Sequence, residues 1–121
     1  MLSVVMAEAA IRQQVGGRDV LQRQLAHLAE QIEAHGPRLQ LRVIPFSVSG
    51  HPVLGAPDFH LLGFPTLRPP ELVWLDTLNG MDLVEDPVAV HEYRLAHAAA
   101  ADAALQVVGS LELIERAAQE L

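Results

Sequence analysis

The sequence has no cysteine and no lysine among its 121 residues. Without cysteine there is no disulfide framework, no thiolate nucleophile and no zinc site with cysteine ligands, and a reducing cytoplasm is the expected compartment. Without lysine, Schiff-base chemistry and a phosphate-binding P-loop are excluded, because both depend on the lysine amine. The sequence therefore excludes the function classes that rely on either side chain.

Positive charge and long apolar runs are also scarce. Eight basic residues, all of them arginine, stand against 15 acidic ones, which gives a formal net charge of -7. This charge repels phosphate backbones and the arginines form no stripe, so we expect no nucleic-acid partner. No apolar run reaches the roughly 20 residues that span a bilayer, and no basic and apolar leader is present. We therefore expect a soluble, cytoplasmic protein without a membrane partner.

Half of the residues are apolar, which is enough for one hydrophobic core in a chain of this length. We therefore predict a single α+β domain over residues 1–121. The order of its elements predicts a mostly antiparallel sheet of four to five strands packed against about three helices. The predicted strands are 2–7, 39–44, 59–64, 72–78 and 81–85, with helical segments at 8–12, 18–35 and 88–108, a last helix from 110, and a stiff connection at 65–70.

Two helix boundaries rest on particular residues. Asp86 and Pro87 suit the N-cap and the first position of the helix that follows them. Gly109 is expected to end that helix, and Ser110 to cap the last one.

The pair Asn79-Gly80 is the strongest turn signal in the chain. A two-residue type I′ turn needs positive φ at both central positions, and Asn-Gly tolerates this best. If these two residues form the turn, Trp74, Asp76 and Glu85 share one face of the sheet. The cross-strand pairs that follow from this register are 78 with 81, 76 with 83 and 74 with 85.

Two carboxylates beside an indole suggest a site for acid-base chemistry. Burial and a neighbouring like charge both raise the pKa of a carboxyl group toward neutrality, which makes the group a usable general acid or base. Asp76 and Glu85 are the candidates. The alternative is that this face is half solvated, or that an arginine pairs with the carboxylates as a structural contact. The candidate arginines are Arg12, Arg42 and Arg94.

Other candidate site residues lie outside this pair. His60 is a candidate proton-transfer group, although the connection at 65–70 leaves open whether it shares the face of Asp76. His51, in a Gly-His-Pro loop, is interpreted as a loop anchor or as the rim of a pocket. Glu8 either caps the helical turn after it or faces a cavity. The histidines show no metal-ligand spacing, so no metal site is expected.

Several short motifs occur in order along nearly the whole chain. They are residues 4–12 (VVMAEAAIR), 15–17 (VGG), 24–28 (QLAHL), 43–46 (VIPF), 50–52 (GHP), 61–65 (LLGFP), the hairpin 73–85, and 93–94 (YR). As a set they resemble the uncharacterised domain that follows the helix-turn-helix in XRE-type, antitoxin-like regulators of actinobacteria, here expected as a stand-alone domain. The resemblance implies an α+β domain that binds a small molecule or a protein partner. His60, Gly63, Trp74 and Asp76 depart from the family pattern, on the strands where a cavity would lie.

Two functions fit these observations. The first is a cofactor-independent enzyme of natural-product, polyketide-type biosynthesis, a cyclase, dehydratase or isomerase that encloses a hydrophobic intermediate. Asp76, Glu85 and His60 would transfer protons there. The second is a non-enzymatic module that binds an effector or a partner, as an orphaned regulator or antitoxin half would, and a homodimer fits either function. The expected substrate-binding residues are Trp74, Phe59, Leu61, Met81, His51 and Glu8.

Overall fold

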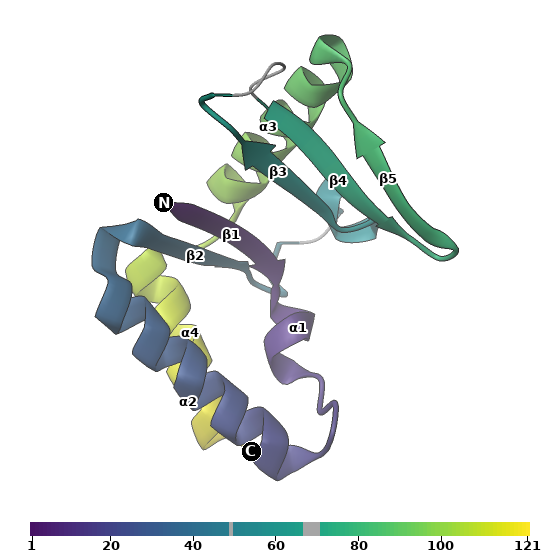
Figure 1. Cartoon of the computed structure of the whole chain (residues 1–121). Coiled ribbons are helices and arrows are strands. Elements are labelled where there is room, and N and C mark those ends of the chain that lie inside the picture. Colours follow the sequence, from purple (N-terminus) through teal and green to yellow (C-terminus); the bar gives the residue numbers. More distant parts are fainter. Residues whose placement is uncertain (49, 67–70) are drawn as a thin grey trace. The chain divides into compact units, whose positions relative to one another are not determined.

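The computed structural model describes residues 1–48, 50–66 and 71–121. The chain divides into two compact units, one of residues 1–49 and 101–121 and the other of residues 50–100. Figure 1 shows the helices and strands of both units, and each unit is an α+β arrangement. The α+β prediction is confirmed, but the strands form a parallel pair and a three-stranded antiparallel sheet instead of one sheet.

The first unit is built on the parallel pair. Strand β1 (Leu2–Ala7) lies beside β2 (Leu39–Ile44), with Leu2 opposite Leu39 and Ala7 opposite Ile44. Parallel neighbours need a crossover connection, and α2 (Arg18–His35) supplies it after the single turn of α1 (Glu8–Arg12). The predicted start and end of α2 are confirmed, with Gly36 at positive φ where the helix stops.

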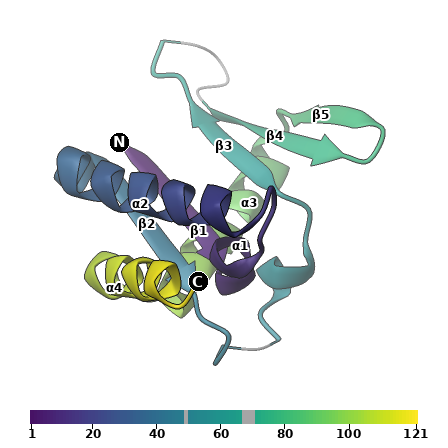
Figure 2. The same cartoon turned by 90° about the horizontal axis from the view of Figure 1, so that it is seen from below.

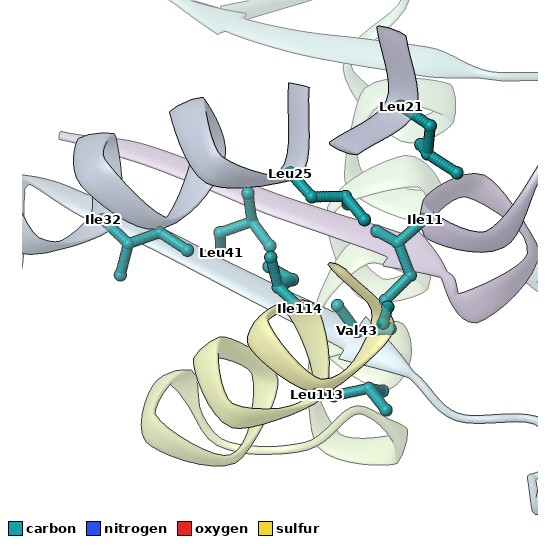
Figure 3. Close-up of a cluster of buried hydrophobic side chains, with 9 residues drawn as sticks. Ile11, Leu21, Leu25, Ile32, Leu41, Val43, Leu113 and Ile114 are labelled. Carbon is teal, nitrogen blue, oxygen red and sulfur yellow. The ribbon is translucent and has the colours of Figure 1, made fainter. Parts of the chain in front are cut away.

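The core of the first unit lies between this pair of strands and two helices. Helices α2 and α4 (Val107–Gln119) pack side by side across the strands, as Figure 2 shows. Leu25 of α2, Val43 of β2 and Ile114 of α4 are almost completely buried and meet in the centre (Figure 3). The other buried members of this cluster are Ile11, Leu21, Ile32, Leu41, Leu113 and Ala117.

The outer edge of β2 is bound by the segment that leads into α4. The amide of Leu105 donates to the carbonyl of Val43 at 2.9 Å, and the amide of Val43 donates to the Ser110 hydroxyl at 2.9 Å. The same hydroxyl donates to the carbonyl of Leu105 at 3.3 Å. These bonds satisfy backbone groups that an open strand edge would leave unpaired.

The prediction for the C-terminal helices is wrong at this point. Helix α3 (Pro87–Ala103) ends before the predicted boundary, and α4 begins at Val107, so Gly109 and Ser110 lie inside a helix. The residue that precedes α4 is Gln106, and Ser110 is completely buried beneath β2 instead of capping a helix end. The start of α3 is confirmed, because the Asp86 carboxylate accepts a hydrogen bond from the Ala89 amide.

The second unit holds the antiparallel sheet. Its strands are β3 (Phe59–Gly63), β4 (Glu71–Thr77) and β5 (Gly80–Val84), with β4 in the middle. A short 3-10 turn, η2 (Pro52–Gly55), precedes β3, and α3 follows β5. The stiff connection predicted at 65–70 lies in part outside the described residues.

The hairpin between β4 and β5 exists, but its predicted turn is wrong. Thr77 pairs with Gly80, so Leu78 and Asn79 are the central residues, and among the described residues only glycines have positive φ. Types I′, II and II′ each need positive φ at a central residue, so they are excluded and type I remains. Gly80 then occupies the fourth position, which glycine favours in a type I turn. The pairing moves by two residues, so the paired side chains stay on their predicted faces. The predicted pair of Trp74 with Glu85 is wrong, because Trp74 lies opposite Leu83 and Glu85 follows the end of β5.

Replacement of Ser110 by alanine tests the bond to β2. We expect Ser110→Ala to lower the free energy of unfolding by about 1 to 3 kcal/mol, because the buried Val43 amide then loses its acceptor. Urea unfolding followed by circular dichroism measures the change. The control, Ser47→Ala at an exposed position, should stay within about 0.5 kcal/mol of the parent protein. Equal stability of the two variants would contradict the role given to Ser110.

Candidate functional site

Two of the three predicted acid-base residues, His60 and Asp76, share one face of the antiparallel sheet. His60 lies directly opposite Trp74, and the Trp74 indole Nε1 donates to the Asp76 carboxylate at 3.1 Å. The question of whether His60 shares the face of Asp76 is therefore answered: the two residues share it. Glu85 comes directly after β5, outside the paired residues.

This face is not an enclosed site. Trp74 is 39% exposed, and Met81 and Leu83, which lie opposite Asp76 and Trp74, are also exposed. His60, Asp76 and Glu85 are exposed as well. Trp74 lies beside Asp76 as expected, but it pairs with Leu83 instead of Glu85, and the apolar enclosure is missing.

Two of the expected substrate-binding residues lie on the opposite face of the sheet. Phe59 pairs with Leu75, and Leu61 pairs with Val73, which is completely buried. Because side chains alternate between faces along a strand, Phe59 and Leu61 cannot line one pocket with Trp74 and Met81. The expected substrate-binding set is thus divided between two surfaces.

The face that carries Phe59 and Leu75 packs against α3. The ring of Phe59 meets Tyr93 edge to face, with centroids 5.0 Å apart. The next residue of α3, Arg94, forms an ion pair with Glu71 of β4. Figure 1 shows α3 running along this sheet.

A groove of about 630 Å³ lies within the second unit, between α3, the sheet and the η2 segment. Its volume falls in the range of pockets that hold small organic ligands. Carbon atoms of aliphatic, aromatic and proline side chains make up most of its wall, so the site suits an apolar ligand body. The lining residues are His51, Pro52, Val53, Ala56, Pro57, Phe59, Leu75, Thr77, Glu92, Tyr93, Leu95, Ala96 and Ala99.

The η2 segment supplies one wall. The amide of Val53 donates to Nδ1 of His51 at 3.2 Å, so the imidazole caps the 3-10 turn. Pro52, the first residue of this turn, and Pro57, which follows the turn, stiffen the segment, because the proline ring fixes φ. His51 therefore fills both of the roles considered for it, since it anchors the loop and lines a pocket.

Helix α3 supplies the other wall through one stripe of its surface. Glu92, Leu95, Ala96 and Ala99 recur at the three- and four-residue spacing that places side chains on one helix face. The alanines leave room between the helix and the other walls. The groove was not predicted, although the small residues of this helix were a signal that could have located it.

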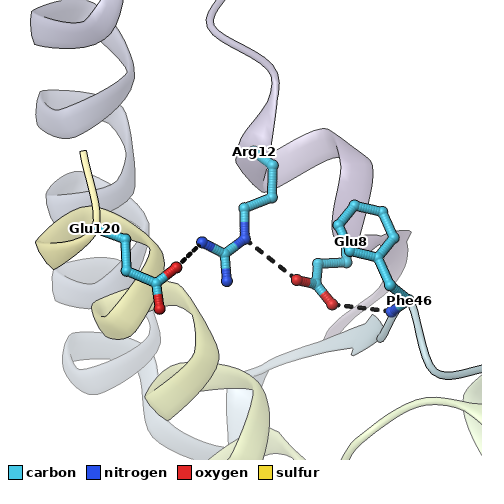
Figure 4. Close-up of polar contacts among 4 residues, drawn as sticks. All are labelled: Glu8, Arg12, Phe46 and Glu120. Atoms are coloured by element: carbon cyan, nitrogen blue, oxygen red, sulfur yellow. Dashed lines mark hydrogen bonds and ion pairs between the residues drawn. The ribbon is translucent and has the colours of Figure 1, made fainter.

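Glu8, the remaining candidate, is a structural residue of the first unit. Its carboxylate accepts a hydrogen bond from the Phe46 amide at 2.9 Å and pairs with Arg12 Nε at 3.2 Å (Figure 4). Arg12 also pairs with Glu120. The bond to Glu120, and to a smaller extent the bond to Glu8, raises the pKa of the Arg12 guanidinium, although burial acts to lower it. Glu8 neither caps α1 nor lines the groove; it joins α1 to the end of β2.

Glu8→Ala tests this connection. We expect a loss of about 1 to 3 kcal/mol in the free energy of unfolding, because the Phe46 amide and Arg12 both lose a charged acceptor. Glu8→Gln should lose less, since an amide oxygen can still accept from Phe46. Chemical unfolding measures both variants, with Glu115→Ala at an exposed position of α4 as the control. Glu8→Ala with the stability of the control would rule out the proposed connection.

The described parts of the chain hold neither a membrane-spanning helix nor a metal-binding group of side chains. No helix there is long and apolar enough to cross a membrane. In the same residues, no group of three histidine or carboxylate side chains is arranged to hold a metal ion.

Comparison with known proteins places the chain in a family. The family model for the domain of unknown function DUF5753 matches residues 1–116, which include almost all of both units. No curated protein and no solved structure gives a significant match. The chain therefore belongs to the DUF5753 family.

Proposed function

We propose that this domain binds a hydrophobic small molecule in the groove beside α3 and acts as the effector-binding module of a cytoplasmic regulator. The observation that carries the proposal is the groove itself, about 630 Å³ in volume and walled mainly by apolar side chains. Burial of an apolar ligand there is favourable in proportion to the area removed from water. The resemblance of the ordered motifs to the domain of XRE-type, actinobacterial regulators supports an effector-binding role.

An acid-base enzyme is the second candidate. The placement of His60, Trp74 and Asp76 on one sheet face favours it, because a histidine and a carboxylate are the groups that proton transfer needs. Binding is preferred because this trio lies on the sheet face opposite to the one that borders the groove. A cyclase, dehydratase or isomerase would have to hold its substrate on an exposed surface, where water competes for every hydrogen bond. Homodimerisation is compatible with both candidates.

Replacement of either of two neighbouring alanines of α3 by phenylalanine tests binding in the groove. Ala99 lines the groove and Ala98, its neighbour on the same helix, is exposed outside it. We expect Ala99→Phe to weaken the binding of Nile red by about tenfold or more, because the phenyl ring occupies the ligand space. Ala98→Phe is the matched control and should bind the dye as the parent protein does.

Fluorescence titration measures the dissociation constants, and thermal unfolding checks that both variants fold. Equal binding by Ala99→Phe and the parent protein would place the dye elsewhere and overturn the proposal. Equal weakening by both variants would also overturn it, because the effect would then not depend on the groove.

A further inference from the structure

Among the described residues that line the groove, the formal charge is negative. Glu92 is the one carboxylate among the lining residues, and no arginine is among them. No ion pair formed by the described residues involves Glu92. Its carboxylate therefore has no ion-pair partner in the part of the chain that the structure describes.

The nearest basic residue along α3 is already occupied. Arg94 pairs with Glu71 of β4 and contacts the ring of His91 at 3.5 Å. Two residues along an α-helix correspond to a rotation of about 200°, so Arg94 projects from the other side of α3 than Glu92. The guanidinium serves the contact between helix and sheet and does not pair with Glu92.

His51 does not supply a positive charge either. Its Nδ1 accepts the hydrogen bond from the Val53 amide, which requires that this nitrogen carry no proton. In this tautomer the ring is neutral, and Nε2 carries the proton. As long as η2 is capped in this way, the lining of the groove has a net negative charge.

The surrounding unit strengthens the same bias. Residues 50–100 contain seven acidic residues and two arginines, and so hold most of the formal net charge of -7. Summed charge of one sign raises the local concentration of oppositely charged ligands around a cleft. An anionic ligand would be repelled both by this field and by Glu92.

We propose that the groove selects amphiphilic cations, molecules with an apolar body and an ammonium or amidinium group. The proposal rests on the proposed function and names the ligand class for the same groove. The apolar body lies against Leu75, Leu95 and the aromatic pair, and the cation pairs with the Glu92 carboxylate. The face of an aromatic ring also attracts a cation, so Phe59 and Tyr93 favour the same ligand class.

A matched pair of probes tests the charge preference. Naphthalenemethylamine is cationic at neutral pH, and naphthalenemethanol has nearly the same shape without the charge. Displacement of Nile red by each probe gives two dissociation constants for each protein. We expect the parent protein to prefer the amine by about twofold to fivefold, the range of an exposed ion pair, and added salt to reduce this preference.

Glu92→Gln should abolish the preference, so that this variant binds the amine and the alcohol about equally. Glu33→Gln, at an exposed position of α2, changes the net charge equally and should retain the preference. The inference is overturned if the amine and the alcohol bind the parent protein equally, or if Glu33→Gln loses the preference as Glu92→Gln does. Displacement by neither probe, together with Nile red binding that Ala99→Phe leaves intact, would instead overturn the proposed function.

Discussion

The edge of β2 is the constraint on which the first unit depends. Val43 has its side chain in the core, and its backbone amide and carbonyl are bound by Ser110 and Leu105. These bonds fix where α4 begins relative to the strand, and this position in turn lets Leu113 and Ile114 reach Leu25 and Val43. The hydrophobic cluster and the polar contacts at the strand edge therefore form one arrangement, because each positions the groups that the other needs.

Elements with local signals were predictable from the sequence. The bounds of α2 follow from the spacing of Leu21, Leu25 and Ile32 and from the glycine after His35, and Asp86-Pro87 marks the start of α3. The boundary between α3 and α4 was missed because serine is a frequent N-cap, and nothing near Ser110 in the sequence indicates a partner 67 residues away. Tertiary contacts decide that boundary, and a pattern of neighbours along the chain does not contain them.

In the hairpin the predicted turn residues are wrong, but the predicted sheet face of the paired side chains is right. The predicted and observed pairings differ by two residues, so alternation between faces is unchanged and side-chain burial cannot distinguish them. The preference of glycine for the fourth turn position then favours the observed register. The adjacency of Trp74 and Asp76 survived for this reason. The groove did not emerge because its walls come from η2, the sheet and α3, which the chain brings together only when folded.

The first unit is discontinuous in sequence, since residues 50–100 are inserted between its two parts. On a ribosome, β1, α2 and β2 would be complete well before α4 leaves the exit tunnel. Until then the β2 edge is unpaired, and the apolar faces of Leu25 and Val43 have no covering helix. Exposed edges and apolar surfaces of this kind invite association with other chains. The strand edge and the apolar faces therefore stay exposed until the residues of α4 emerge, and a chain truncated before α4 would leave them open to such association.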